Sequence, residues 1–260
     1  MNHWRVFRVA LLVGARDFRL FWNWRTWAFG WMARILTSAA SWVLVGKLVG
    51  DAGRLDYLLI GNASVAGVGT FAVAASAWER WDGTYPLLVA APSSMAPAMM
   101  GRMAIWVLHW VASSLCTFAL LLAVFGLRLS FPALLVVPLG VILLSLSTYA
   151  LSLFLGAWIG LIPALRNIVI NILTTAILVL SGATVKVAFW PKWVQAIARI
   201  LPATHALAGI RSALAGGSAW TVARAFGLEI VVCLGWLALA LLTIDRIADA
   251  GRASGSIHLS

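Results

Sequence analysis

The residues that could carry out chemistry are few in this chain, and they lie far apart. The 260 residues include four histidines and two cysteines, namely His3, His109, His205, His258, Cys116 and Cys233. Both cysteines lie inside apolar runs, where buried, unreactive thiols are expected rather than a disulfide or a metal site. No phosphate-loop spacing precedes Gly46-Lys47, and the His-Glu-x-x-His and Gly-x-Ser-x-Gly patterns of metallo- and serine hydrolases are absent from the sequence. We therefore expect no catalytic residue, no metal site and no cofactor on this chain.

Three titratable residues interrupt long apolar runs and need a structural or functional explanation. A charge near the centre of a bilayer costs about 3 kcal/mol or more, so Arg34 and Glu229 should face a cavity or a partner. Arg34 is expected near the end of its run, from where it could reach the membrane surface. For Glu229 two interpretations stay open, a group on a substrate path or a structural partner of Arg224 or of another helix. His109 is expected to be packed or hydrogen-bonded rather than a proton carrier.

Composition places these residues in a membrane protein. Charged residues make up 10% of the chain and hydrophobic residues 63%, whereas soluble domains are roughly 25% charged. The net charge of +11 comes mostly from arginines scattered between apolar runs. Binding of nucleic acid would need a contiguous basic face, so we expect no nucleic-acid partner. Anionic lipid head groups are the expected counterparts of these arginines.

The apolar runs predict an all-α integral membrane protein with six spans in a single domain, 1–260. A bilayer core of about 30 Å needs roughly 20 apolar residues per helix. The predicted spans are 27–49, 57–78, 103–127, 133–160, 167–185 and 225–244. Residues 186–224 are too polar to span and too apolar for an ordinary loop. They are expected to form short helices at the interface or re-entering the membrane.

Residues 1–25 predict an amphipathic helix lying in the membrane interface. Four arginines, Arg5, Arg8, Arg16 and Arg19, fall within roughly an 80° arc of a helix, and most large apolar residues lie outside that arc. The alternative is a simple basic anchor for the first span. Either interpretation places the N-terminus in the cytoplasm, and six spans would place the C-terminus there too.

The segment 79–101, between the second and third predicted spans, has the composition of a short docking helix. It begins Glu79-Arg80-Trp81-Asp82-Gly83-Thr84-Tyr85-Pro86-Leu87-Leu88-Val89-Ala90-Ala91-Pro92-Ser93. Glu79 and Arg80 place opposite charges at the membrane boundary. Gly83 permits a break in the chain, and Thr84 could cap the next helix. Leu87 and Leu88 would give that helix an apolar face, although Pro86 should delay its start.

A second group of residues follows the fifth predicted span. It comprises Ser181-Gly182, Pro191-Lys192-Trp193, Leu201-Pro202-Ala203-Thr204-His205 and Arg211. Glycine and proline break the helical pattern here, whereas 193–200 has helix-like apolar spacing.

Both groups resemble the permeases of type-2 ABC transporters. The first follows that family's pattern E-R-x-x-G-T-x-x-x-L-L-x-x-P, with Glu79, Arg80, Gly83, Thr84 and Pro92 in register. The second matches a later pattern of the same family, which consists of a break with small residues, then P-x-W, then L-P-x-T-H and an arginine further on. The resemblance implies that the first segment couples to an ATPase. It also implies that the second forms outward-facing re-entrant helices, and the residues concerned are Pro191, Trp193, Pro202, Thr204, His205 and Arg211.

The resemblance further implies the function of a transmembrane subunit in an ATP-driven exporter. ATP and Mg would bind a separate ABC ATPase subunit, and a second copy or a similar permease would complete the path. Apolar spans with few polar groups favour an amphipathic drug, an antibiotic or a lipid-like cargo. The arginine-rich, lysine-poor composition suggests a bacterial inner membrane. Two alternatives remain, a membrane-embedded lipid-modifying enzyme and a passive channel or assembly factor.

Overall fold

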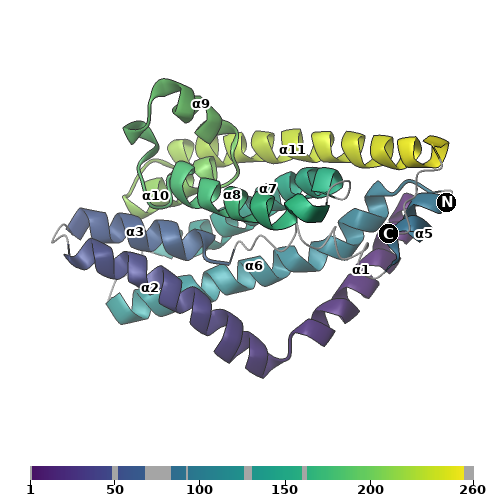
Figure 1. Ribbon diagram of the computed structural model, residues 1–260. Coiled ribbons are helices and arrows are strands. Elements are labelled where there is room, and N and C mark those ends of the chain that lie inside the picture. Colours follow the sequence, from purple (N-terminus) through teal and green to yellow (C-terminus); the bar gives the residue numbers. More distant parts are fainter. Residues whose placement is uncertain are drawn as a thin grey trace.

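The computed structural model describes residues 2–48, 52–67, 83–91, 93–125, 131–159 and 163–254, and these ranges contain helices but no strand (Figure 1). The long helices are α1 (His3–Phe21), α2 (Ala33–Leu48), α3 (Ala52–Val65), α6 (Ala96–Phe125), α7 (Phe131–Ile159), α8 (Arg166–Leu180) and α11 (Ala219–Ser254). The shorter ones are the π-helix η1 (Thr26–Met32), α5 (Tyr85–Ala90), α9 (Lys192–Ile200), α10 (Thr204–Leu214) and two 3-10 turns, η2 (Pro163–Leu165) and η3 (Val187–Phe189).

Among the described residues, four helices are long and apolar enough to cross a membrane. They are Thr26–Leu48, Ala96–Phe125, Ala133–Ile159 and Ala219–Ala253. These helices correspond to four of the predicted spans, so the all-helical membrane architecture is confirmed. The predicted span 167–185 corresponds to the 15-residue α8, and the span 57–78 begins in α3 and continues outside the described residues. The count of six spans therefore stays a prediction.

The predicted amphipathic helix at the N-terminus exists as α1 and packs along the first half of α6. Gly14 and Gly101 lie at the crossing, where a Cβ at Gly14 would be 2.2 Å from the carbonyl oxygen of Arg102. The Asp17 carboxylate also forms an ion pair with Arg102 at 2.9 Å. The arginines of the predicted stripe, Arg5, Arg8, Arg16 and Arg19, are exposed on the opposite side. The 1–25 segment thus has the two-faced structure that its sequence predicts.

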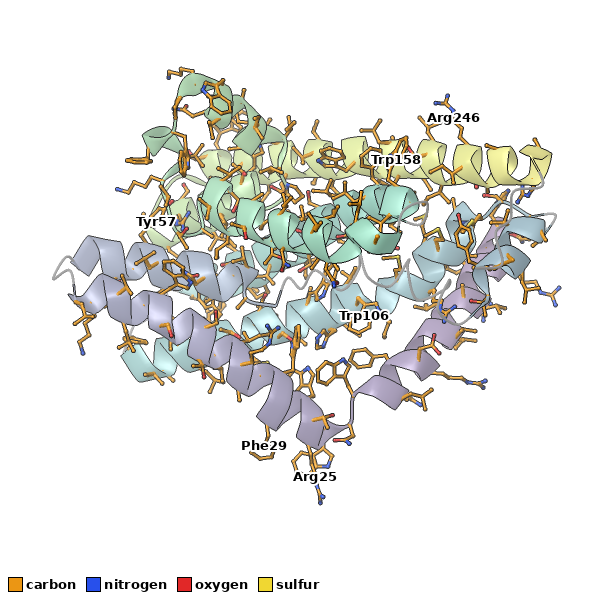
Figure 2. All side chains as sticks on the ribbon, in the orientation of Figure 1. Arg25, Phe29, Tyr57, Trp106, Trp158 and Arg246 are labelled. Carbon is orange, nitrogen blue, oxygen red and sulfur yellow. The ribbon has the colours of Figure 1, made fainter. Side chains whose placement is uncertain are left out.

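The chain bends sharply between α1 and η1, and we call this bend the elbow, residues 22–34. Figures 1 and 2 show it at the lower edge of the molecule. Figure 2 shows Arg25 and Phe29 there, pointing away from the other helices. From the elbow, η1 and α2 continue toward the end of the bundle that holds α9 and α10 (Figure 1).

The two ends of the bundle carry different short helices (Figure 1). At one end, α5 lies beside the C-terminal end of α11 and near the start of α1. At the other end, α9 and α10 lie against the N-terminal half of α11. A helix of 36 residues is about 54 Å long, well above the roughly 30 Å of a bilayer core. The helix α11 therefore reaches from α10 at one end to α5 at the other and extends past the membrane.

Candidate functional site

The helix α5 occupies the segment that the sequence singled out for docking. Gly83 before it has a φ of +67°, a left-handed conformation that suits glycine. The helix begins at Tyr85, so the expectation that Pro86 delays its start is wrong. Proline fits the first helical turn because the amide hydrogen that it lacks has no partner there. Thr84 stands at the N-cap position, although its side chain makes no capping hydrogen bond.

One face of α5 is buried and the other is open. Tyr85 and Val89 are buried against α6 and α11, whereas Leu87 is 72% exposed and Leu88 is partly buried. Three predicted coupling residues, Glu79, Arg80 and Pro92, lie outside the described residues. An exposed leucine on a helix that is otherwise held against the bundle suits contact with another protein.

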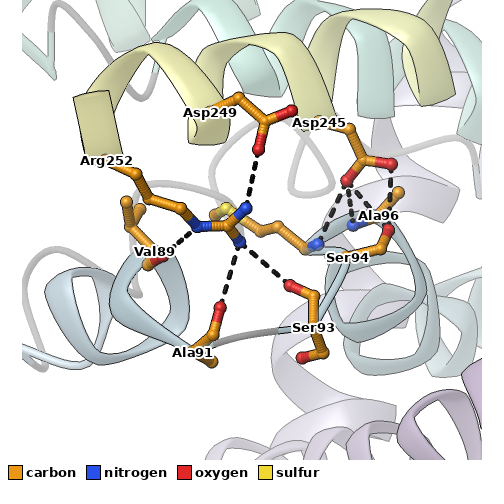
Figure 3. Close-up of polar contacts among 9 residues, drawn as sticks. Val89, Ala91, Ser93, Ser94, Ala96, Asp245, Asp249 and Arg252 are labelled. Atoms are coloured by element: carbon orange, nitrogen blue, oxygen red, sulfur yellow. Dashed lines mark hydrogen bonds and ion pairs between the residues drawn. The ribbon is translucent and has the colours of Figure 1, made fainter. Parts of the chain in front are cut away.

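Arg252, near the end of α11, binds the carbonyl end of α5 (Figure 3). Its Nε–H donates to the carbonyl oxygen of Val89 at 2.7 Å, and Nη2 donates to those of Ala91 at 3.1 Å and Ser93 at 2.9 Å. Asp249 accepts from Nη1 at 2.7 Å and so holds the guanidinium in place. A cation at a helix C-terminus is also favoured by the helix dipole.

Asp245 lies two turns earlier on α11 and binds the start of α6 (Figure 3). Its Oδ1 accepts from the backbone N–H of Met95 at 3.1 Å and of Ala96 at 3.2 Å. Both carboxylate oxygens lie 2.9 Å from the Ser94 hydroxyl. The carboxylate thus supplies the cap that satisfies the first amide groups of α6.

Together Asp245 and Arg252 form what we call the α11 clamp. The clamp fixes both sides of the short connection from α5 to α6, so α5 and the end of α11 should move as one unit. Sequence reasoning missed both residues because it ended the last span at 244. The signal present in the sequence was the run of charges just beyond that point.

At the opposite end of α11, Glu229 performs a similar task for α10. The residue is 0% exposed, and Oε1 accepts from Ala203 N–H at 2.9 Å. Its Oε2 accepts from His205 N–H at 3.1 Å and Ala206 N–H at 3.0 Å. Arg224 is exposed, and among the described residues no ion pair joins it to Glu229. The carboxylate is therefore bound by amide groups at the start of α10.

The L-P-x-T-H residues form the tight connection between α9 and α10. Pro202 is buried, and Ala203 after it has a φ of +77°, which is uncommon for a residue with a side chain. The Thr204 hydroxyl donates to the carbonyl oxygen of Ala198 at 2.6 Å, and His205 Nε2 lies 2.9 Å from that of Arg199. Both side chains bind the last carbonyls of α9. The motif thus builds a corner between two helices.

Arg211, further along α10, joins that helix to α3 and to the break after α8. Its guanidinium lies 3.6 Å from the centre of the Tyr57 ring, a cation–π contact. The Nη2 group donates to the carbonyl oxygens of Tyr57 at 3.1 Å and Ala183 at 3.3 Å. The Tyr57 hydroxyl donates to the Gly182 carbonyl at 2.6 Å. The Ser181-Gly182 break is therefore the place where Arg211 and Tyr57 attach.

Aromatic side chains around α9 are exposed rather than packed. Trp193 on α9, Phe189 before it and Trp220 at the start of α11 are each more than two thirds exposed. Pro191 stands at the N-cap position of α9 and is also exposed. Tryptophan is enriched at membrane–water interfaces, where the ring and its N–H meet different surroundings.

A cavity of about 270 Å³ lies between α2, α3, α7 and α8. Its polar lining includes Arg34, Ser38, Asn62, Thr148, Ser152, Asn171 and Thr174. Hydroxyl and amide groups of this kind are expensive to expose to lipid, so they mark a surface that faces water, a ligand or another protein. Arg34 is among the residues that line this cavity.

The chain matches the family described as ABC-2 type transporter over residues 11–215. This match covers most of the chain, including the described parts of both motifs, and the chain therefore belongs to the ABC-2 type transporter family. It is a membrane permease of an ABC transporter. Searches of curated proteins and of solved structures give no significant match.

Proposed function

We propose that this chain is the membrane subunit of an ATP-driven exporter, with α5 as the helix that docks on a separate ATPase chain. ATP and Mg would bind that ATPase, and this chain would hold no cofactor. The observation that carries the proposal is the α11 clamp, which fastens α5 to the longest helix while leaving Leu87 exposed. A helix that only closed a loop would need no such attachment to a span.

The proposed topology has six spans, with α1, α5 and the end of α11 on the cytoplasmic side. The spans are those predicted at 27–49, 57–78, 103–127, 133–160, 167–185 and 225–244. Charged residues gather at the end of α11 between Asp245 and Arg252, which suits a segment outside the bilayer. On this topology α9 and α10 lie on the outer side, where Trp193 and Trp220 would anchor them in the interface. The arginine composition supports a bacterial inner membrane.

A second copy of this chain, or a similar permease, would complete the substrate path. The polar cavity supports this arrangement because Ser38 on α2 and Asn171 and Thr174 on α8 line it and are exposed in the described part of the chain. A second permease would cover these polar side chains better than lipid would. ATP-driven closure of two ATPase subunits would move α5, and the clamp would pass that movement to α11. An amphipathic drug, an antibiotic or a lipid-like molecule suits a path with scattered polar groups between apolar walls.

The proposal is tested by crosslinking from single cysteines at the two ends of the bundle. Cys116, which is exposed and not buried as expected, and Cys233 are both free and are first replaced by serine. Leu87→Cys is then compared with Trp193→Cys, a control of similar exposure, 72% against 69%, at the other end.

The expected result is that Leu87→Cys captures a chain whose peptides include an ATP-binding phosphate loop, with a yield that changes on adding ATP. Trp193→Cys should react with a membrane-impermeant thiol reagent from outside the cell. The proposal fails if Leu87→Cys reacts with that external reagent, because α5 would then face away from the cytoplasm. A passive channel or an assembly factor would show no ATP-dependent change in yield.

A further inference from the structure

A cluster of aromatic rings surrounds His109 at the elbow, where α1 and η1 lie against α6. His109 is 5% exposed. The ring centroids that lie between 5.3 and 6.4 Å from that of His109 belong to Phe18, Trp22, Trp27, Trp31 and Trp106. Figure 2 shows Trp106 on the side of α6 that faces the elbow. The segment η1 is a π-helix, an irregularity often found at functional sites.

Hydrogen bonding fixes which ring nitrogen of His109 is the donor. Trp27 Nε1–H donates to His109 Nδ1 at 3.1 Å, so Nδ1 is an acceptor and a neutral ring carries its proton on Nε2. Within the described part of the chain, His109 Nε2 and Trp22 Nε1 are both buried without a hydrogen-bond partner. The two rings are stacked at an interplanar angle of 20°. Two neighbouring N–H donors therefore have no acceptor among the described residues, which is rare for buried groups.

Cavities lie on both sides of Trp22. One, of about 300 Å³, is lined by His109 and by apolar residues of α6, including Leu108, which is 66% exposed. The other, of about 850 Å³, is lined by Arg25, Phe29, Gly30 and Arg34 among others. Among the residues that the structure describes, no carboxylate lines either cavity. The elbow thus combines unpaired donors, two cations and apolar surface.

Within the described ranges, no carboxylate forms an ion pair with either arginine, so both positive charges are available to a ligand. The guanidinium of Arg25 lies 5.3 Å from the Trp24 ring centre, and that of Arg34 lies 4.6 Å from the Trp31 ring centre. Asp17, the only acidic residue before position 51, is paired with Arg102 instead. Aromatic contacts orient a guanidinium without neutralising it.

We propose that the elbow is a binding site for one acidic phospholipid of the surrounding membrane. Arg25 and Arg34 would bind its phosphate, and His109 Nε2–H and Trp22 Nε1–H would donate to its ester carbonyl oxygens. Its acyl chains would lie along exposed apolar side chains such as Phe29 and Leu108, which a free anion would leave uncovered. A zwitterionic lipid would bring a cation toward two arginines, so charge complementarity selects the acidic class. The proposal needs only the membrane location of the chain and does not depend on the export function.

The test measures binding of phosphatidylglycerol and of phosphatidylcholine with identical acyl chains to the full-length chain in detergent, by native mass spectrometry. Phosphatidylglycerol should bind at least ten-fold more tightly. Gly30→Leu should weaken that binding at least ten-fold at an unchanged melting temperature, because a Cβ at Gly30 meets nothing within 4 Å and the side chain can enter the larger cavity. Gly235→Leu, also with open space around its Cβ, is the matched control and should bind normally.

A second set of variants tests the role of the arginine charges. The double variant with Arg25→Gln and Arg34→Gln should bind the two lipids equally, whereas Arg246→Gln, at an exposed site on α11, should keep the preference. Equal binding of both lipids to the unmodified chain would overturn the proposal, as would normal binding by Gly30→Leu. Displacement of phosphatidylglycerol by inorganic phosphate at an equal concentration would show an anion site without lipid recognition, and this too would overturn it.

Discussion

Replacing Glu229 by glutamine tests whether this buried carboxylate holds α10 on α11. The carboxylate accepts three backbone N–H groups, two on Oε2 and one on Oε1. Glutamine has one acceptor oxygen, which can keep the hydrogen bonds from His205 and Ala206. Its amide NH₂ group then faces the N–H of Ala203 and leaves that buried donor unpaired. Loss of one charge-assisted bond and weakening of two others should cost about 2–4 kcal/mol.

The assay is thermal unfolding of the purified chain in detergent. A loss of that size should lower the melting temperature by roughly 5–10 °C on the scale of proteins of this length. Arg246→Gln on the same helix is the matched control, because Arg246 is exposed and lies outside the α11 clamp. If Glu229→Gln has the melting temperature of Arg246→Gln and of the unmodified chain, the amide contacts do not hold α10 and the reasoning is refuted.

Two further predictions concern the clamp and a close helix contact. Arg252→Gln should reduce the stimulation of a co-purified ATPase by transport substrate several-fold, because glutamine cannot reach three carbonyl oxygens at once. Arg246→Gln, at an exposed position, should keep that stimulation. Equal stimulation in both variants would show that the clamp is dispensable. Gly61→Ala should lower the melting temperature by several degrees, because the added Cβ would lie 2.0 Å from the carbonyl oxygen of Ala183. Gly227→Ala, which has open space around its Cβ, serves as the control. An unchanged melting temperature for Gly61→Ala would mean that α3 and the break after α8 are not in fixed contact.

The helices were predictable because each long apolar run must satisfy its backbone hydrogen bonds internally in a bilayer. The run at 133–160 was correctly predicted as a single helix despite Pro138. The end of α11 was misplaced because its apolar run stops at 244, whereas the helix continues through the charged residues to Ser254. Charge marks where a helix leaves the membrane, and this can differ from where the helix ends.

The contacts of the candidate site were less accessible to sequence reasoning. Arg252 and Asp245 bind backbone atoms about 150 positions away. Residues of almost every type carry the same backbone donors and acceptors, so the residue types of the partners do not reveal these contacts. The spacing of Arg224 and Glu229 suggested a pair on one helix, yet the partners of Glu229 are amide groups near His205. Only the irregular L-P-x-T-H corner, which exposes free N–H groups to a neighbour, could have pointed to them.

The attachment of α11 at both ends has a thermodynamic consequence. About 35 Å of unbroken helix separates Glu229 from Arg252, so a shift of α10 can be passed along α11 to α5. Coupling between two sites is reciprocal: if ATP binding to an ATPase docked on α5 changes the affinity of a molecule for α10, that molecule changes the affinity for ATP by the same factor. On the proposed topology and ATPase docking, an antibody fragment that binds the α9–α10 surface from outside the cell should then alter ATP binding by the ATPase on the cytoplasmic side.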